Sequence, residues 1–262
     1  MSAILLENEI VHYEVLGRGR PILFLHGWVG SWRYWVPAMQ AVSFAYRAYA
    51  LDFWGYGDSA KIPERYSVQA QVNLIEAFFE ALGIAKAALV GHAFGGAIAL
   101  SFARQYPQRV DRLFTISLPT RPDAVNSRLW EDEPTVLANW LLDGIPGSAT
   151  AVQDAPKTER AAISQSIADI QNLQPEKLIT EIDLLCLHAF GADDQAISKP
   201  DFSAFDALSP RSHPILFEQS SHFPMLQESS KFHRLLLEFL KIESDETPEK
   251  LEIKEEWKRR FR

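Results

Sequence analysis

Residues 87–106, AALVGHAFGGAIALSFARQY, contain the feature that decides the fold. Their first six residues form an apolar run typical of a strand that is buried on both faces, and residues 94–106 have the small, apolar composition of a closely packed helix. The junction between them is Gly91-His92-Ala93-Phe94-Gly95-Gly96. Because glycine lets neighbouring backbone approach closely, this junction predicts a sharp strand-to-helix turn with Ala93 at its apex.

The segments on either side of this turn alternate between strand-like and helix-like patterns. Strand-like runs cover residues 3–15, 22–26, 47–52, 87–92, 110–118, 183–190 and 214–217, and helical patterns cover residues 67–82, 94–106 and 227–241. Short buried strands that alternate with helices pack into a mostly parallel sheet with helices on both faces. The predicted fold class is therefore α/β, with a doubly wound, mostly parallel sheet.

Residues 119–180 interrupt this alternation. Prolines separate short helical stretches there, at 135–142 and 158–172, and no strand pattern is evident. We interpret residues 119–180 as an inserted helical cap, and residues 1–118 and 181–241 as the core that carries it.

The last segment, residues 242–262, is a charged C-terminal tail in which acidic and basic residues alternate. Such a composition is typical of a solvated helix or a frayed terminus. A weak contact with an anionic surface is the alternative, and it would use Lys258, Arg259, Arg260 and Arg262.

Charge and composition exclude several classes of protein. The net charge of −8 argues against a nucleic-acid partner, and no apolar run approaches the roughly 20 residues that span a bilayer. The N-terminus lacks the basic region of a signal peptide, and Cys186 is the only cysteine, so no internal disulfide can form. We therefore expect a soluble, cytoplasmic protein without a membrane span, and the sequence leaves a homodimer open.

Two further motifs follow other predicted strands. His26-Gly27-Trp28-Val29-Gly30-Ser31 follows the run at 22–26, and Asp52-Phe53-Trp54-Gly55-Tyr56-Gly57-Asp58-Ser59 follows the run at 47–52. Together with the junction at 91–96, these motifs resemble the α/β-hydrolase superfamily, and in particular its serine esterase/lipase-like branch. The nucleophile elbow of that branch is similar but carries a serine where this chain has Ala93. The resemblance covers residues 1 to about 241 and implies an α/β-hydrolase fold.

The resemblance also implies a set of site residues. In this fold the chain order is nucleophile, acid and histidine, so the acid is expected after the run at 183–190. The family's spacing points to Asp194 as the acid, with Asp193 as the second choice, and to His222 as the base. The backbone N–H groups of Trp28 and Phe94 would form the oxyanion hole.

Other polar residues have simpler interpretations. His213 precedes a proline at the start of a strand and His233 lies within an amphipathic helix, so we expect both to be structural or exposed. Asp52 and Ser59 are interpreted as hydrogen-bonding anchors of their turn. No histidine has metal-ligand spacing with a partner, and the family implies no metal and no organic cofactor.

The reaction that the resemblance implies is hydrolysis of a carboxylic ester or thioester through an acyl-enzyme. Aromatic side chains are the candidates for lining a substrate pocket, and they favour a small, apolar ester. The expected pocket residues are Trp130, Trp140 and Phe223.

Ala93 leaves three explanations open, because a methyl group cannot attack a carbonyl carbon. In the first, which we favour, a serine-to-alanine change has silenced a serine hydrolase. In the second, alanine is natural and the protein is a non-catalytic, ligand-binding pseudo-hydrolase. In the third, the missing nucleophile is the aspartate of a haloalkane dehalogenase or epoxide hydrolase. Those enzymes usually have tryptophan after the nucleophile, whereas this chain has Phe94.

Overall fold

The computed structural model describes residues 2–243, 247–248 and 251–254. Its centre is one eight-stranded sheet with the strand order β1-β2-β4-β3-β5-β6-β7-β8. β2 pairs antiparallel with both of its neighbours, and all other neighbouring strands are parallel. The mostly parallel α/β sheet is therefore confirmed. The strands are β1 (Ser2–Leu6), β2 (Glu9–Gly17), β3 (Arg20–Leu25), β4 (Tyr46–Leu51), β5 (Ala87–His92), β6 (Val110–Ile116), β7 (Leu185–Gly191) and β8 (Ser212–Phe217).

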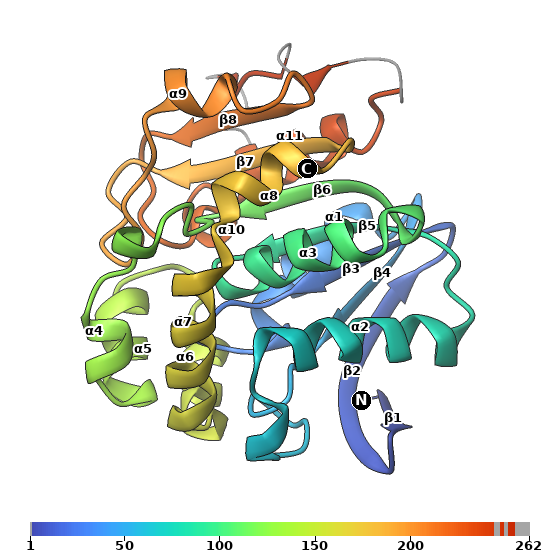
Figure 1. Ribbon diagram of the computed structural model, residues 1–262, viewed down its shortest axis with the longest axis vertical. Helices are drawn as coiled ribbons and strands as arrows, with labels where there is room; N and C mark the ends of the chain where they lie inside the picture. The colour runs from blue at the N-terminus through green and yellow to red at the C-terminus, as the bar shows by residue number, and fades with distance from the viewer. Residues whose placement is uncertain (1, 244–246, 249–250, 255–262) are drawn as a thin grey trace.

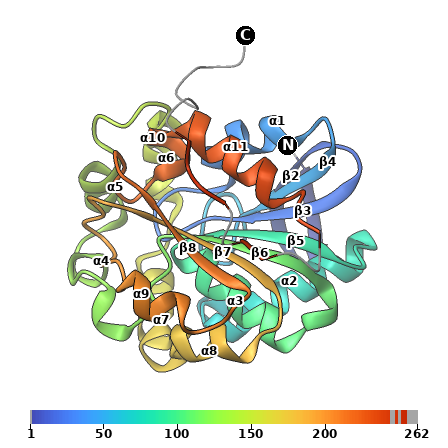
Figure 2. The ribbon, with the colours of Figure 1, turned by 90° about the horizontal axis from the view of Figure 1, so that it is seen from above.

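Helices cover both faces of this sheet, and a further group lies beside the carboxyl ends of the parallel strands. Figure 2 shows α1 and α11 on one face and α2, α3 and α8 on the other. Figure 1 shows the helices α4 to α7 gathered at one end of the sheet. The bounds are α1 (Val36–Val42), α2 (Val68–Leu82), α3 (Phe94–Gln105), α4 (Arg128–Glu131), α5 (Pro134–Leu142), α6 (Ala149–Asp154), α7 (Arg160–Leu173), α8 (Pro175–Glu181), α9 (Phe202–Asp206), α10 (Pro224–Gln227) and α11 (Ser229–Phe239).

The central strands are buried because helices cover them on both sides. Every residue of β5 and β7 is buried, as their unbroken apolar patterns predict. α2 begins where the Ser67 hydroxyl accepts a hydrogen bond from the N–H of Ala70, and it ends at Gly83, whose φ of 64° is left-handed. These local signals explain why the sequence indicates α2 to within one residue.

Two helical segments differ from the sequence prediction. The helix expected at 227–241 is broken at Glu228, which separates α10 from α11. A short 3-10 helix, Trp32–Trp35, followed by α1 occupies a region for which the sequence predicts no element. Its aromatic residues all point into the core, so they lack the alternation of buried and exposed positions that identifies an amphipathic helix.

The segment between β6 and β7 contains α4 to α8 and, since all of it is described, no strand of its own. Its single β contact is an isolated bridge between Val125 and Ile197. α8 packs against α3, so this last helix belongs to the layer that covers the sheet. The group α4 to α7 remains as the candidate cap.

An ion-pair ring ties this group to the core. Asp154, at the end of α6, contacts Arg33 Nε at 2.9 Å and Lys157 Nζ at 3.0 Å. Asp58, in the turn after β4, contacts Lys157 Nζ at 2.8 Å and Arg33 Nη2 at 3.4 Å. Asp154 is buried and also accepts a hydrogen bond from the Ser31 hydroxyl at 2.5 Å. The ring therefore holds α6 against two loops of the core.

The described part of the C-terminal tail is less solvated than expected. Pro248 is buried, and Leu251 is only 8% exposed. Lys258, Arg259, Arg260 and Arg262, the candidates for an anionic surface contact, lie outside the described residues. Within the described residues, no helix combines the length and the apolar character needed to cross a bilayer.

Candidate active site

The turn between β5 and α3 holds Ala93 in a strained conformation. Ala93 has φ 46° and ψ −107°, which is unfavourable for any residue with a side chain, and such positions cost about 1–3 kcal/mol. The Ala93 N–H donates to the carbonyl of Ile116 at 2.7 Å, which fixes the turn against β6. A Cβ on Gly95 would lie 2.5 Å from the carbonyl oxygen of Leu25, so the close approach of β3 requires glycine there. This is the geometry of a nucleophile elbow, with alanine at its apex.

The carboxylate of Asp194 and the ring of His222 form a buried pair. His222 Nδ1 lies 2.9 Å from Asp194 Oδ2 and 3.1 Å from Oδ1, and both side chains are 3% exposed. The N–H groups of Ala196 and Ile197 donate to Asp194 Oδ1 at 2.8 and 3.0 Å. With Nδ1 bound to the carboxylate, Nε2 is the ring atom that remains to exchange a proton.

The environment keeps the Asp194 carboxyl group ionised. Burial by itself would raise its pKa, but the charge of His222 and hydrogen bonds from His222, Ile197 and Ser117 oppose burial. The net pKa lies below the ordinary value for aspartate. A charged acid next to the ring can fix its tautomer and stabilise the imidazolium form. Asp193, the second choice, is exposed, and it is Asp194 that contacts the histidine.

The two residues expected to supply oxyanion donors, Trp28 and Phe94, come from segments that lie close to Ala93. Phe94 is the first residue of α3, so its N–H has no acceptor within the helix. Trp28 follows Gly27, and a Cβ on Gly27 would lie 3.4 Å from the Ala93 methyl group. The rings of Trp28 and Phe94 stack with a centroid distance of 6.1 Å. The indole N–H of Trp28 donates to the Ser166 hydroxyl of α7 at 2.9 Å, so the candidate cap touches this loop directly.

The three expected pocket residues lie in different surroundings. Phe223 is fully buried, and its ring lies 4.7 Å from that of His92. Trp140 is half-buried on α5, and its indole N–H donates to Gln195, the residue after the acid. Trp130 is half-buried on α4. Of the two tryptophans of the candidate cap, Trp140 therefore contacts the loop that carries Asp194.

Sequence reasoning missed Ser117, which follows β6. Ser117 has φ 49°, and its hydroxyl lies 3.4 Å from the carbonyl oxygen of His222 and also hydrogen-bonds the Asp194 carboxylate. Its N–H donates to the carbonyl of Ala189 on β7 at 2.8 Å. No local motif marks this serine, because its partners come from β7 and from two later loops.

His12, Asp52 and Asp58 bring potential metal ligands within 4.8 Å of one another. The carboxylate of Asp52 already accepts N–H groups of Trp32 and Asp58 at 2.9 Å each, and Asp58 is paired with Lys157. A neighbouring ammonium group opposes the binding of a cation, so we interpret this cluster as structural. The expected role of Asp52 as an anchor fits these hydrogen bonds.

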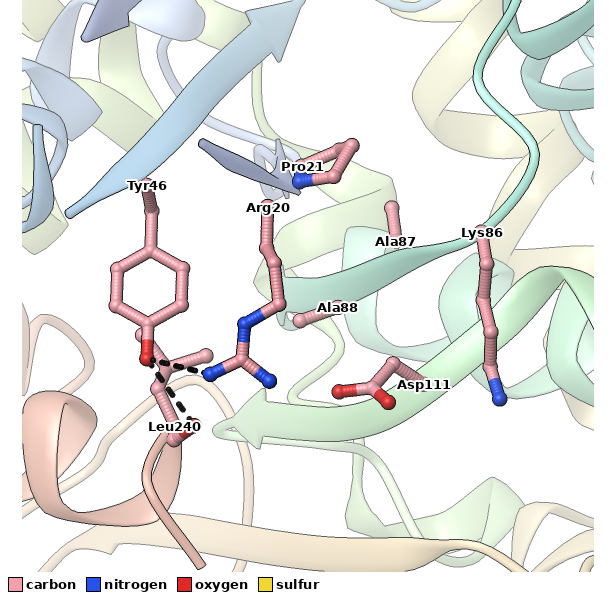
Figure 3. Close-up of a pocket in the computed structure, with 8 residues that line it drawn as sticks. All are labelled: Arg20, Pro21, Tyr46, Lys86, Ala87, Ala88, Asp111 and Leu240. Carbon is pink, nitrogen blue, oxygen red and sulfur yellow. Dashed lines mark hydrogen bonds between the residues drawn. The ribbon is translucent and has the colours of Figure 1, made fainter. Parts of the chain in front are cut away.

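A separate hollow of about 130 Å³ lies at the amino ends of the central strands. Figure 3 shows the phenol of Tyr46 and the side chains of Arg20, Lys86 and Asp111 around it. Ala93 lies at the carboxyl end of β5, whereas this hollow contacts its amino end at Ala87. The hollow is therefore at the opposite end of the sheet from the candidate site.

Known proteins resemble this chain in sequence, and solved structures resemble it in fold. A pimeloyl-[acyl-carrier protein] methyl ester esterase of Aliivibrio salmonicida is 25% identical over 259 residues, which cover 90% of this chain and 97% of that protein. Epoxide hydrolase 1 of Caenorhabditis elegans is 30% identical over 190 residues, which cover 69% of this chain and 46% of that protein. The enol-lactonase of Burkholderia xenovorans superposes with a TM-score of 0.80 at 17% identity, covering 92% of this chain and all of that one.

A serine-to-alanine mutant of the meta-cleavage product hydrolase of Pseudomonas fluorescens also superposes, with a TM-score of 0.76 at 24% identity over 92% of this chain and 97% of that one. The family model described as alpha/beta hydrolase fold matches residues 20–162, which is more than half of the chain. The chain therefore belongs to the alpha/beta hydrolase fold family.

Proposed function

We propose that this chain has the active site of a serine hydrolase that cleaves carboxylic esters or thioesters, and that Ala93 leaves this site without its nucleophile. The observation that carries this proposal is the buried pair of Asp194 and His222, in which His222 Nδ1 lies 2.9 Å from Asp194 Oδ2. A binding protein needs neither an ionised buried acid nor a histidine oriented by it. Both have a use in acyl transfer, where the histidine must accept and return a proton.

The chemistry follows from the geometry once an oxygen stands at position 93. His222 Nε2 would take the proton from the hydroxyl as it attacks the ester carbonyl, and Asp194 would stabilise the imidazolium. The N–H groups of Trp28 and Phe94 would hold the developing oxyanion. His222 would then protonate the leaving alcohol, and water would release the acyl group by the reverse sequence. None of these steps uses a metal or an organic cofactor.

Without that oxygen, the barrier rises steeply. In subtilisin, loss of the serine lowers kcat by about 2 × 10⁶-fold. A decrease of that size corresponds to roughly 8.5 kcal/mol of activation free energy. We therefore expect this chain to be almost inert toward esters.

The proposed substrate is a small ester with an apolar acyl group. The rings of Trp28 and Phe94 stack with a centroid distance of 6.1 Å next to the elbow, so the surroundings of residue 93 are apolar and favour such a group. The curated relatives of nearly equal length are methyl ester esterases, which also favours a small alcohol as the leaving group.

The test is to install Ala93→Ser and to measure hydrolysis of p-nitrophenyl and methyl esters of short-chain acids. We expect a gain in kcat/KM of at least about 10³-fold over the alanine form, because Asp194 and His222 would supply the rest of the proposed triad. The double variant Ala93→Ser, His222→Gln is the control, and it should lose this gain. An Ala93→Ser protein that folds normally and shows no gain refutes the proposal.

The second candidate is a hydrolase with an aspartate nucleophile. Two epoxide hydrolases, from Caenorhabditis elegans and Sus scrofa, are 30% and 32% identical over parts of this chain. An Ala93→Asp variant that opens epoxides or releases halide, while Ala93→Ser stays silent on esters, would support it. The remaining explanation is that Ala93 is natural and that the protein is a ligand-binding pseudo-hydrolase. Reading codon 93 in the native gene distinguishes this explanation from an introduced alanine. In a natural pseudo-hydrolase, His222→Ala should leave the ligand affinity unchanged.

A further inference from the structure

A chain of hydrogen bonds runs behind the elbow and joins three loops of the candidate site. The Gly27 N–H lies 2.6 Å from the Tyr34 hydroxyl oxygen, and that hydroxyl lies 3.1 Å from His92 Nδ1. His92 Nε2 lies 2.9 Å from the carbonyl oxygen of His222. These hydrogen bonds thus connect the loop of Gly27 and Trp28 (the proposed oxyanion loop) through the elbow to the loop of the proposed base, His222 (the base loop).

The direction of each hydrogen bond is fixed by its end groups. The carbonyl of His222 can only accept, so His92 Nε2 carries a proton and donates it. In the neutral ring Nδ1 is then an acceptor, and the Tyr34 hydroxyl donates to it. The Gly27 N–H can only donate, so the Tyr34 oxygen accepts from it. Every donor therefore has an acceptor when His92 is neutral.

Burial keeps the side chains of His92 and Tyr34 uncharged. Desolvation lowers the pKa of His92 well below its ordinary value, and the neighbouring His222 lowers it further. Desolvation raises the pKa of Tyr34 well above its ordinary value. The His92 ring lies 4.5 Å from the His222 ring. A neutral His92 does not repel the positive charge that His222 would acquire during catalysis.

We propose that Tyr34 and His92 are positioning residues that hold the oxyanion loop and the base loop at a fixed separation on either side of the elbow. This inference rests on the proposed hydrolase function. Fixing the Gly27 amide restrains the peptide before the Trp28 N–H, and fixing the His222 carbonyl restrains the backbone that carries the imidazole. Small displacements of reacting groups are costly, since a shift of about 1 Å can lower a rate about 10²-fold.

The first test compares Tyr34→Phe with Tyr46→Phe in the Ala93→Ser background. Phenylalanine at 34 keeps the ring contacts with Trp35 and Phe223 and removes only the hydroxyl. Tyr46 is the matched control, because its buried hydroxyl donates to the Leu240 carbonyl at 3.1 Å (Figure 3). Tyr46 is the first residue of β4 and so lies at the opposite end of the sheet from Ala93.

We expect Tyr34→Phe to lower kcat about 10–100-fold while KM changes by less than about twofold. Tyr46→Phe should leave both constants unchanged. Equal kcat values for the two variants overturn the proposal, and so does a loss in Tyr34→Phe that appears only in KM.

A second measurement on the alanine form separates this inference from the function on which it rests. Nitrogen NMR of the His92 ring should show a neutral imidazole protonated at Nε2 at pH 6, with slow exchange of the Gly27 amide that Tyr34→Phe accelerates. A ring protonated at Nδ1 overturns the hydrogen-bond chain itself. If the NMR result is as expected but Ala93→Ser has no activity, the chain of bonds stands and the positioning role is refuted together with the proposed function.

Discussion

The strain at Ala93 leads to a prediction about stability that needs no activity. Replacing Ala93 by glycine should relieve the unfavourable backbone, because φ 46° and ψ −107° lie in a region that glycine adopts freely. The matched control is Ala97→Gly, one turn into α3, where the alanine is equally buried but helical. Comparing the two variants separates the relief of strain from the ordinary cost of losing a methyl group.

The magnitudes can be worked from the structure. Loss of the fully buried methyl group costs about 0.8 kcal/mol at either position. Glycine also adds freedom to the unfolded chain, which costs about 0.4–1 kcal/mol. Only Ala93→Gly regains the strain of about 1–3 kcal/mol. Ala97→Gly should therefore destabilise the fold by about 1–2 kcal/mol, and Ala93→Gly should be more stable than that control by about 1–3 kcal/mol.

Urea unfolding followed by tryptophan fluorescence measures this difference. The two midpoints are comparable as long as the slope m is the same for both variants. If Ala93→Gly loses as much stability as Ala97→Gly, the elbow is not strained, and the account of how the turn presents residue 93 is wrong.

Two further predictions concern the loops that carry Asp194 and His222. Asp194→Asn should cost about 1–3 kcal/mol of stability at pH 7, since the lowered pKa of Asp194 means that its ionised form favours the folded state. That contribution is present above the unfolded pKa of about 3.9 and is lost as the pH falls through the lower, folded pKa. Unfolding measured from pH 7 downward should show a constant gap between variant and parent to about pH 4 and a narrowing gap at lower pH, and a gap that stays constant well below the unfolded pKa contradicts it. Gly191→Ala should destabilise the fold by about 1–3 kcal/mol and abolish any activity gained by Ala93→Ser, because the new Cβ would lie 1.9 Å from the carbonyl oxygen of Ser221. Calorimetry and ester assays check it, and a fully active variant would show that the loop before His222 tolerates displacement.

The sequence predicts those parts of the site that depend on local patterns. The glycines around Ala93 are needed for close contacts within one turn, so their spacing indicates a sharp strand-to-helix turn, and the resemblance to the α/β-hydrolase superfamily identifies that turn as an elbow. Asp194 and His222 each follow a strand whose apolar run is evident, and the carboxyl ends of parallel strands meet at one edge of a sheet. The resemblance to the α/β-hydrolase superfamily implies their pairing, and the order of the strands is consistent with it, although the distance between the two side chains could not be predicted.

Residues that act through distant partners carry no such signal. Tyr34 reaches His92 across 58 positions of sequence, and it lies in a helical segment whose aromatic residues show no periodic exposure. No local sequence pattern distinguishes Ser117 from the other serines, and its proximity to Asp194 is evident only in the folded structure. The ion-pair ring joins Arg33 and Asp58 to Asp154, and charged residues so far apart in sequence give no indication of which will meet.

The contacts that organise this site do not involve the side chain of residue 93. The Ala93 N–H donates to the Ile116 carbonyl and holds the elbow. The N–H groups of Ala196 and Ile197 donate to the Asp194 carboxylate, and His92 donates to the His222 carbonyl. Because these contacts do not depend on the side chain at position 93, we expect the proposed site to keep its arrangement when a hydroxyl is introduced there. It follows that Ala93→Ser should change the rate of ester hydrolysis far more than it changes the fold.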